Sequence, residues 1–400
     1  MFLTLTHRCN LACKYCFVQQ EALDMPLQVA LDSVDFVINN LASERDSASI
    51  AFFGGEPLLR WDDIIVPTVL YKEQKYPDKQ CKFSITTNCV LLTEDKIKFM
   101  KEHNIGILTS IDGAKETQDY NRPFHDGKGS FDVVEANLKL YKDIVGLDRP
   151  GFRSTVYPPT CQYLYKNYLY AIEFGYKLMF FISDSFSEWT PDKEEIVKAE
   201  LEKISDHYIN YWKNYKKAPI MLRSITNHLD AVASDVERRF RGLPSIRKIS
   251  ASKCGYGQGR SAAISPKGDI YGCQEMTSNE GKDSIFYIGN IYDGTNDERR
   301  IHLKEIFEST SPKGDMPCID CKAKAFCDGG CIANNYMING DFNRAPHGYC
   351  FFMRLVYDTN EKIYKALKDI PEFKNFLKSL QKKSAKSCSN CQLCQNSENK

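Results

Sequence analysis

The cysteines are the residues of this chain most able to do chemistry. All of the sixteen except Cys81, Cys89 and Cys161 fall in groups with short spacings. Spacings of the CxxC type bring thiolates together around one metal ion or iron–sulfur cluster, which a disulfide does not require. Disulfides are moreover typical of small domains in oxidising compartments. The pattern therefore favours metal or iron–sulfur ligation.

The first group, Cys9, Cys13 and Cys16, directly follows a short apolar stretch that we expect to be the first strand. Three thiolates on one loop can hold three irons of a cubane 4Fe–4S cluster, which leaves the fourth iron open to a small molecule. A structural zinc site is the alternative, but such a site needs a fourth ligand and no fourth cysteine is near. His7 is close, and we expect it to pack beside the loop. The motif therefore predicts an open iron–sulfur cluster.

The segment Phe53-Gly54-Gly55-Glu56-Pro57 stands at the end of the second expected strand. Glycine lets a backbone approach a ligand closely, and the Glu56 carboxylate can accept a hydrogen bond from an ammonium group. A plain Gly-Gly turn is the alternative interpretation.

The first cysteine motif, with an aromatic residue before its last cysteine, and the Gly-Gly-Glu-Pro element together resemble the radical S-adenosylmethionine (SAM) superfamily. The resemblance implies that the amino and carboxylate groups of SAM chelate the open iron. It also implies that an electron cleaves SAM to methionine and a 5′-deoxyadenosyl radical, which abstracts a hydrogen from the substrate. The family commonly has glycine where Cys89 stands. The implied SAM-binding residues are Gly54, Gly55, Glu56, Thr87, Asn88, Ser110, Asp112 and Arg122.

Arg122 is the implied partner of the SAM carboxylate, and a surface position for this arginine is the alternative.

The C-terminal cysteines resemble, spacing for spacing, the SPASM domain of radical SAM enzymes that modify peptides and proteins. The resemblance implies two auxiliary 4Fe–4S clusters besides the SAM-binding one. An unrelated zinc ribbon is the alternative. The implied ligands of the distal auxiliary cluster are Cys318, Cys321, Cys327 and Cys350, and those of the proximal cluster are Cys254, Cys273 and Cys331.

The proximal cluster is expected to have an open iron, available to a substrate thiolate. Relatives with full ligation have a further cysteine shortly after the position of Cys254, and this chain has none there.

The elements that position these residues alternate in the first half of the chain. Short apolar strands followed by helices predict βαβ units and a parallel sheet, with functional groups at the carboxyl ends of the strands. We expect an α/β fold, a partial (β/α)6 radical SAM barrel followed by a cysteine-rich SPASM domain. Strands are expected at 2–6, 49–53, 82–87, 106–111, 152–157 and 178–182, and helices at 27–41, 94–102, 131–141 and 164–174.

We predict four regions: the barrel at 1–190, a helical bridge at 191–250, the SPASM domain at 251–381 and a polar tail at 382–400. Little periodic structure is expected beyond residue 250, so the clusters would hold this region folded, and loss of Cys318 or Cys321 should unfold it. The tail cysteines Cys388, Cys391 and Cys394 could bind a metal, supply an outside ligand to a cluster or remain unligated.

The charged residues nearly balance, with 53 Lys and Arg against 52 Asp and Glu and a formal net charge of +1. This balance gives no long-range attraction to nucleic acid or to an anionic membrane. The sequence shows no secretory signal and no apolar run long enough to span a bilayer. A cytoplasmic protein without nucleic-acid or membrane partners is therefore expected.

The combined resemblance implies a peptide- or protein-modifying enzyme. The preferred function is that of a peptide maturase, which forms a thioether or another crosslink in a ribosomally made peptide. Such an enzyme would need an electron donor such as ferredoxin or flavodoxin, and a separate protein or the bridge helices would recognise the leader peptide.

An anaerobic sulfatase-type maturase, which forms formylglycine, is the alternative function. Those enzymes characteristically have an aspartate just after the position of Cys273, where this chain has Gln274 and then Glu275. A non-catalytic iron–sulfur electron carrier is a further alternative, although a carrier would need neither an open cluster nor the strand-end loops.

Overall fold

The computed structural model describes residues 1–41, 48–147, 151–245, 261–277, 281–309 and 314–389, and the side chains of the last helix only up to Leu380. The chain forms two compact units. Unit 1 comprises Met1–Ser154 and Cys254–Ser309, and unit 2 comprises Thr155–Lys253 and Thr310–Lys400.

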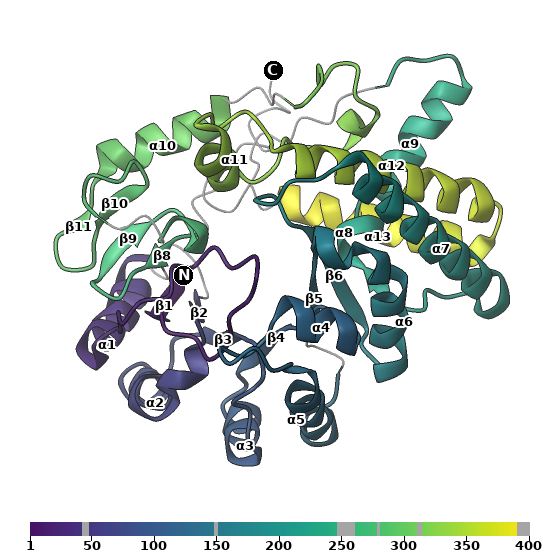
Figure 1. Cartoon of the computed structure of the whole chain (residues 1–400). Helices are drawn as coiled ribbons and strands as arrows, with labels where there is room; N and C mark the ends of the chain where they lie inside the picture. The colour runs from purple at the N-terminus through teal and green to yellow at the C-terminus, as the bar shows by residue number, and fades with distance from the viewer. Residues whose placement is uncertain (42–47, 148–150, 246–260, 278–280, 310–313, 390–400) are drawn as a thin grey trace. The chain divides into compact units, whose positions relative to one another are not determined.

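The sheet of unit 1 is built on parallel strands that neighbour one another in chain order (Figure 1). Their register pairs, for example, Phe2 with Ala51 and Phe52 with Ile85. Each strand lies within a residue or two of its predicted position, so these strand predictions are confirmed. The strands are β1 (Phe2–Thr6), β2 (Ala48–Gly54), β3 (Cys81–Thr87), β4 (Gly106–Ser110) and β5 (Gly151–Val156).

Four short strands after residue 260 extend the same sheet. Strand β8 (Ala263–Ile264) pairs in parallel with β1 on the side away from β2. Strands β9 (Asp269–Tyr271), β10 (Tyr287–Asn290) and β11 (Gly294–Thr295) then follow in antiparallel pairs. The segment that contains Cys273 therefore belongs to unit 1 and lies in sequence next to a strand of its sheet.

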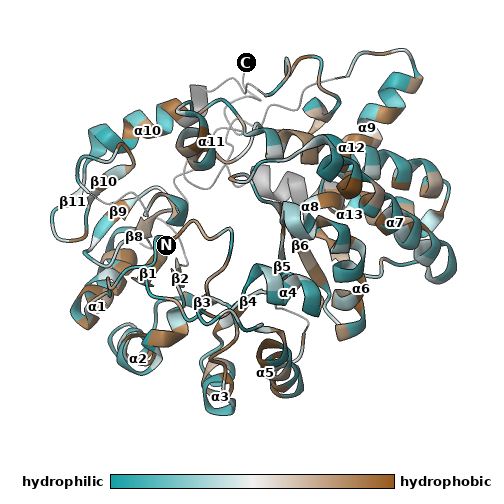
Figure 2. Cartoon of the chain, viewed as in Figure 1, coloured by the Kyte–Doolittle hydropathy of each residue, from teal (hydrophilic) through white to brown (hydrophobic). Residues whose placement is uncertain are grey.

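Helices α1 (Leu27–Phe36), α2 (Val66–Lys75), α3 (Glu94–Glu102) and α5 (Phe131–Ile144) lie along the outer side of β1–β4 (Figure 1). Their buried residues follow helical spacing, as in α5, where Val134, Leu138 and Tyr141 are buried. Figure 2 shows hydrophobic and hydrophilic residues alternating along them, as an inner and an outer face require. The other helical elements of unit 1 are η1 (Val37–Leu41), η2 (Pro57–Arg60), η3 (Trp61–Ile65), α4 (Lys115–Asn121), η5 (Gln274–Met276) and α10 (Asp297–Ser309).

Unit 2 is mainly helical. Its strands β6 (Leu178–Ser183) and β7 (Met221–Leu222) are parallel, and its longest helices pack on one another, α12 against both α7 and α9. The predicted helix at 164–174 is confirmed as α6. The helices are η4 (Pro158–Tyr163), α6 (Leu164–Phe174), α7 (Pro191–Tyr215), α8 (Arg223–Thr226), α9 (Leu229–Phe240), η6 (Lys322–Ala325), α11 (Ile332–Asn339), α12 (His347–Leu367) and α13 (Pro371–Ser389).

The expectation of little periodic structure beyond residue 250 is wrong, because α12 and α13 are both long helices. Helix α12 buries Phe352, Val356 and Ile363 on one face. Polar Asn360 is also fully buried there, and its Nδ2 donates to the carbonyls of Ile225 and Val356 at 2.8 and 3.0 Å. The buried apolar residues of α12 nevertheless follow helical spacing, so the hydrophobic periodicity of this segment could have predicted the helix.

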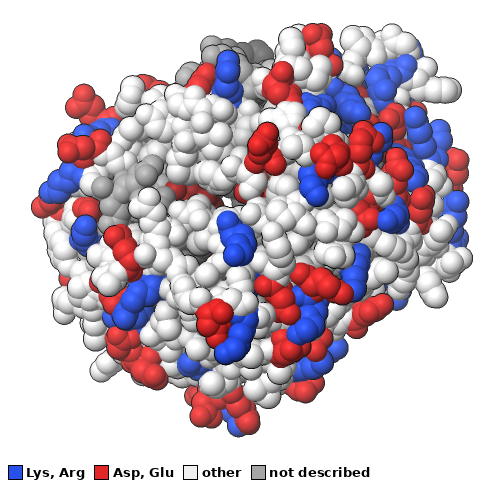
Figure 3. Space-filling model, viewed as in Figure 1, with Lys and Arg blue, Asp and Glu red and all other residues white. Residues whose placement is uncertain are grey.

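The surface shows no concentration of one charge on the face drawn in Figure 3, where lysines and arginines are mixed with acidic residues. This agrees with the net charge of +1. Among the described residues, none of the helices combines the length and the apolar character needed to cross a bilayer.

Candidate cofactor sites

Cys9, Cys13 and Cys16 lie on the loop that follows β1 in unit 1. The loop folds back on itself, since the Cys16 N–H donates to the Cys13 carbonyl at 3.2 Å. Burial raises the pKa of Cys9 to about 12 and that of Cys13 to about 11, and the neighbouring thiols add to both shifts. Thiolate is the form that binds metal, so a positively charged partner is needed to deprotonate this group of thiols.

Two glycines let the end of β2 approach the start of this loop. At Gly54, whose φ is +138°, a Cβ would lie 2.2 Å from the Thr6 carbonyl oxygen. At Gly55 a Cβ would lie 2.1 Å from the Arg8 carbonyl oxygen. The Gly55 N–H donates to Thr6 at 2.8 Å, so the two glycines fix the cysteine loop against β2.

Glu56 joins the ends of β2 and β3 through its carboxylate. The side chain is 1% exposed and accepts hydrogen bonds from the Asn88 N–H at 2.8 Å, the Thr87 hydroxyl at 2.9 Å and the Leu58 N–H at 3.0 Å. Burial raises its pKa to about 7, although these hydrogen bonds oppose the shift. A buried carboxyl group with three donors remains a suitable partner for a cation, because each carboxylate oxygen has two lone pairs.

Asn88 connects Glu56 to the cysteine loop. Its Nδ2 donates to Asn10 Oδ1 at 2.8 Å and lies 3.7 Å from the Cys9 sulfur. The structure therefore brings Glu56, Thr87 and Asn88, which sequence reasoning placed at two different strand ends, into one network beside Cys9.

Asp112 and Arg122 form a second network on the other side of the loop. Fully buried Asp112 accepts from Arg122 Nη2 at 3.2 Å, from Asn121 Nδ2 at 2.9 Å and from the Tyr15 hydroxyl. Arg122 also lies over the Tyr15 ring, 5.3 Å from its centroid, with Nη1 3.9 Å from the Cys13 sulfur. Asp112 thus orients Arg122 and Tyr15 toward the cysteine loop, and Ser110 is buried nearby in sequence at the end of β4.

Arg122 is only 6% exposed, so the surface position that the sequence left open is excluded. Its Nε is buried and has no hydrogen-bond partner among the described residues. A buried guanidinium N–H without an acceptor is costly, and an anionic ligand would satisfy it. This orphaned donor is what the SAM carboxylate would require.

The backbone conformation at Cys89 accounts for the glycine that the family commonly has at this position. Its φ is +67°, in the left-handed region, and the residue is fully buried. Asn137 stabilises this turn, because its Nδ2 donates to the carbonyls of Cys89 and Val90 at 3.0 and 2.9 Å.

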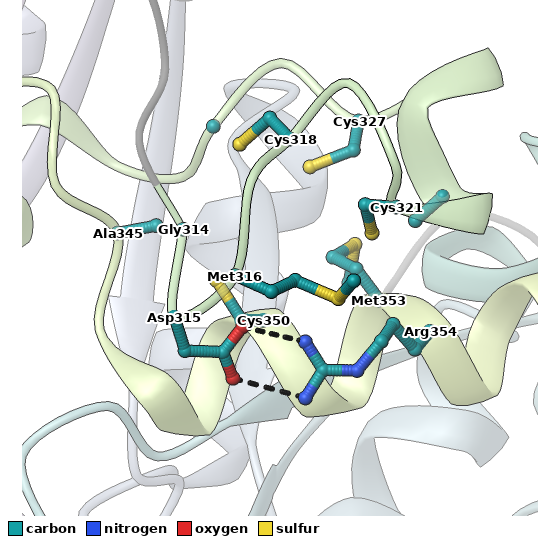
Figure 4. Close-up of a pocket in the computed structure, with 12 residues that line it drawn as sticks. Gly314, Asp315, Met316, Cys318, Cys321, Cys327, Ala345, Cys350, Met353 and Arg354 are labelled. Carbon is teal, nitrogen blue, oxygen red and sulfur yellow. Dashed lines mark hydrogen bonds and ion pairs between the residues drawn. The ribbon is translucent and has the colours of Figure 1, made fainter.

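A second site lies in unit 2, where four cysteines line one cavity of about 30 Å³ (Figure 4). This volume exceeds the roughly 10–15 Å³ that a single water needs. Burial raises the pKa of Cys327 to about 12 and that of Cys350 to about 11. The cysteines are those implied as distal ligands, Cys318, Cys321, Cys327 and Cys350. A cavity lined by four sulfurs fits an iron–sulfur cluster.

Charged residues that sequence reasoning did not single out stand beside this cavity. Asp315 and Arg354 line it and form an ion pair, and His347 lies between Asp315 and Glu194. These residues come from distant parts of the chain, and no local pattern marks them.

The remaining predicted ligands lie outside the described residues or in different units. Cys254 lies outside them, as do Cys391 and Cys394 and the side chain of Cys388. Cys273 precedes η5 in unit 1, and Cys331 precedes α11 in unit 2. Within the described ranges, no three His, Cys, Asp or Glu side chains converge closely enough to hold a single metal ion. The proximal ligand set stays a prediction.

Similarity to curated proteins extends over most of the chain. The sequence is 26% identical over 342 residues to a cysteine-type anaerobic sulfatase-maturating enzyme of Clostridium perfringens, covering 81% of this chain and 85% of the relative. It is 31% identical over 231 residues to an uncharacterized protein of Methanocaldococcus jannaschii, covering 55% of this chain and 75% of that protein.

Solved structures show the same fold. The structure of anSMEcpe with bound AdoMet matches with a TM-score of 0.70 at 21% identity, covering 94% of this chain and 97% of that one. Streptococcus suis SuiB bound to its precursor peptide SuiA matches with a TM-score of 0.57 at 15% identity, covering 87% and 75%.

The family comparison agrees with the motif and with the site described in unit 1. Residues 3–156, which contain all the predicted SAM contacts, match the radical SAM superfamily. The radical SAM resemblance drawn from the sequence is therefore confirmed, and the chain is an enzyme whose residues 3–156 form a radical SAM domain.

Proposed function

We propose that this enzyme abstracts a hydrogen atom from a peptide or protein substrate with a SAM-derived radical, within a partial (β/α)6 barrel and with two auxiliary clusters. Two observations carry the proposal. In unit 1 a three-cysteine loop lies beside Arg122, whose buried Nε has no partner among the described residues, and in unit 2 four cysteines line one cavity. The first set suits a cofactor that must accept a small molecule, and the second suits one that only transfers electrons.

The residues of unit 1 divide the recognition of SAM between its two charged groups. Glu56, fixed by Asn88 and Thr87, would accept from the ammonium group. Arg122, fixed by Asp112, would donate through Nε to the carboxylate. Cys9, Cys13 and Cys16 would hold the iron–sulfur cluster, and the chemistry that this group would supply when bound is the one-electron reduction that cleaves SAM to methionine and a 5′-deoxyadenosyl radical.

Formation of a thioether or other crosslink in a ribosomally made peptide is the first candidate outcome. The fold shared with SuiB, whose structure holds a precursor peptide, supports a peptide substrate. Gln274 stands where sulfatase maturases have an aspartate, which also favours this outcome. An electron donor such as ferredoxin and a separate leader-recognition protein stay predictions of this proposal, as does a cytoplasmic location.

Formylglycine formation is the second candidate, because similarity to the Clostridium perfringens maturase extends over 85% of that enzyme. Glu275 provides a carboxylate one residue after Gln274. Burial raises its pKa, and its charge interacts with Arg153 and with Cys16 of the first cysteine loop. Glu275 would then take the proton that a base must remove from the substrate.

Product analysis separates these outcomes. The anaerobically reconstituted enzyme is incubated with SAM, dithionite and cysteine-containing peptides that carry deuterium at carbon. Transfer of deuterium into 5′-deoxyadenosine is expected. A crosslinked product keeps its sulfur and loses a pair of hydrogens, whereas formylglycine loses sulfur and gains a hydrazide-reactive aldehyde. If SAM is cleaved but the 5′-deoxyadenosine contains no deuterium from any of the peptides or proteins tested, the proposal is contradicted.

Cysteine variants test whether deuterium transfer depends on the three-cysteine loop of unit 1. Replacing Cys9, Cys13 and Cys16 together should abolish deuterium transfer. Cys81→Ala is the matched control, because Cys81 is a partly buried cysteine at the start of β3 and belongs to neither cysteine site.

A further inference from the structure

Arg354 occupies a defined position at the four-cysteine cavity of unit 2. It lies one turn after Cys350 in α12 and lines the same cavity (Figure 4). Its guanidinium group donates to both carboxylate oxygens of Asp315, Nη1 to Oδ1 at 2.7 Å and Nη2 to Oδ2 at 2.9 Å. Such a bidentate pair fixes the direction of the guanidinium group as well as its distance.

Asp315 also contacts His347. His347 Nδ1 lies 2.8 Å from Asp315 Oδ2, and His347 Nε2 lies 2.5 Å from Glu194 Oε1 in the first turn of α7. The series Glu194–His347–Asp315–Arg354 therefore connects α7 to the cavity within unit 2. Side-chain exposures of 22% for both Asp315 and Arg354 show that the pair at the cavity is largely shielded from water.

A cluster held by four thiolates is an anion, and each added electron makes it more negative. A charge in a shielded site is costly unless an opposite charge or hydrogen-bond donors stand beside it. Arg354 interacts electrostatically with Cys350 and Cys321, and the Asp315 backbone N–H is hydrogen-bonded to Cys350. Net charge and hydrogen bonds at the sulfurs are known to set the reduction potential of such clusters.

We propose that Arg354, held in place by Asp315, is the cation that sets the reduction potential of the auxiliary cluster in the four-cysteine cavity. The inference rests on the proposed function, because it requires a cluster at these four cysteines. Asp315 is a positioning residue, and its own negative charge acts on the cluster in the opposite sense to that of Arg354.

The proposal is testable because changes at Arg354 and at Asp315 should shift the reduction potential of the cluster in opposite directions. Reduction of the full-length, reconstituted protein is followed by electron paramagnetic resonance during a redox titration. Arg354→Gln should lower the equilibrium constant for adding one electron at least tenfold, a negative shift of about 59 mV. Arg354→Lys should lie between this variant and the wild type, and Asp315→Asn should shift the potential to a more positive value.

Lys362→Gln is the matched control. It removes an ion pair between α12 and α7, with Lys362 Nζ 2.7 Å from Asp206, and Lys362 does not line the cavity. Its potential should equal that of the wild type. If Arg354→Gln does not retain iron, Arg354→Lys and Asp315→Asn still give the two opposite shifts.

The presence of a cluster in the cavity and the role of Arg354 can be contradicted by different results. If the Cys318→Ala/Cys321→Ala variant keeps all of its iron, no cluster is bound at the cavity and the proposed function of this site is wrong. If that variant loses iron, but Arg354 and Asp315 variants keep iron with unchanged potentials, the role of Arg354 is overturned. Shifts of the same sign in both variants would also overturn it, because they would indicate a loosened site instead of a change in charge.

Discussion

Both cysteine sites contain an ion pair between an arginine and an aspartate, and the two sites differ in how deeply this pair is buried and in how many hydrogen bonds the arginine donates to the aspartate. In each, an arginine is paired with an aspartate beside a cysteine, Arg122 with Asp112 in unit 1 and Arg354 with Asp315 in unit 2. The side chains of Arg122 and Asp112 are 7% and 0% exposed, whereas both members of the second pair are 22% exposed.

The difference supports the function that we propose for each site. Unit 1 offers three cysteines and an arginine whose buried Nε lacks a partner among the described residues. Unit 2 offers four cysteines around its cavity and an arginine with both ends of its fork engaged by Asp315. An incomplete ligand set with an unsatisfied donor suits the binding of a small molecule, while a complete set suits electron transfer.

The largest expected effect concerns unit 1. The wild type reconstituted without oxygen should contain about twelve irons, from three cubanes of four, and replacing Cys9, Cys13 and Cys16 together should remove about four and abolish SAM cleavage. Iron and 5′-deoxyadenosine are measured on the same samples, with Cys81→Ala as control. SAM cleavage by the triple variant would remove the distinction between the two sites.

The matching change in unit 2 should leave SAM cleavage intact. Cys318→Ala/Cys321→Ala should lose about four irons and form no peptide product. The sequence alone predicted that this change would unfold the domain. The structure supports a smaller effect, because α12 also packs against α7 and α9, and Tyr357 of α12 packs with Val232 of α9. Far-ultraviolet circular dichroism should therefore show nearly wild-type helix content, and loss of most of the helical signal would contradict the revised account.

Glu56→Ala should weaken SAM binding by about 1.5–3 kcal/mol through the loss of a charge-assisted hydrogen bond. The change also leaves the Asn88 and Leu58 N–H groups without their acceptor, so Glu56→Gln is the better-matched variant. Affinity is measured by equilibrium dialysis under anaerobic conditions. Unaltered affinity in both variants would show that Glu56 only joins β2 to β3.

SAM affinity should also depend on pH through Glu56, whose pKa burial raises to about 7. Because this value lies above that of a carboxyl group in the unfolded chain, the contribution of Glu56 to folding is present at lower pH and is lost as pH rises through about 7. A bound ammonium group favours the ionised carboxylate, so SAM affinity should increase over the same interval. Glu56→Gln should remove this pH dependence, and a wild-type affinity that is flat across pH 7 would count against the contact.

The smallest effect is expected at Cys89. Glycine adopts its φ of +67° without the roughly 1–2 kcal/mol that a side chain pays there, but it loses buried contacts. Cys89→Gly should therefore change the free energy of unfolding by no more than about 1 kcal/mol, whereas Cys89→Val should be clearly destabilising. Thermal unfolding of the two variants compares them directly, and equal effects would show that backbone conformation is not the constraint.

Much of unit 1 could be predicted from the sequence, because its strands are short apolar runs and its helices have regular apolar spacing. The Cys9, Gly54 and Glu56 motifs are local in sequence, so a reading of spacing finds them. The pairing of Asp315 with Arg354 and of His347 with Glu194 could not be predicted, since contacts between distant segments leave no local pattern. Helix α12 is a different case, because its buried apolar residues follow helical spacing and the sequence could have predicted it.

The most direct test of the difference between the two sites is the electron paramagnetic resonance spectrum of the dithionite-reduced protein with and without SAM. SAM should alter the spectrum of the wild type and of Cys318→Ala/Cys321→Ala, because both retain the three-cysteine cluster. It should have no effect on the variant that lacks Cys9, Cys13 and Cys16. A response to SAM in that triple variant, or none in the wild type, would contradict the assignment of SAM binding to unit 1.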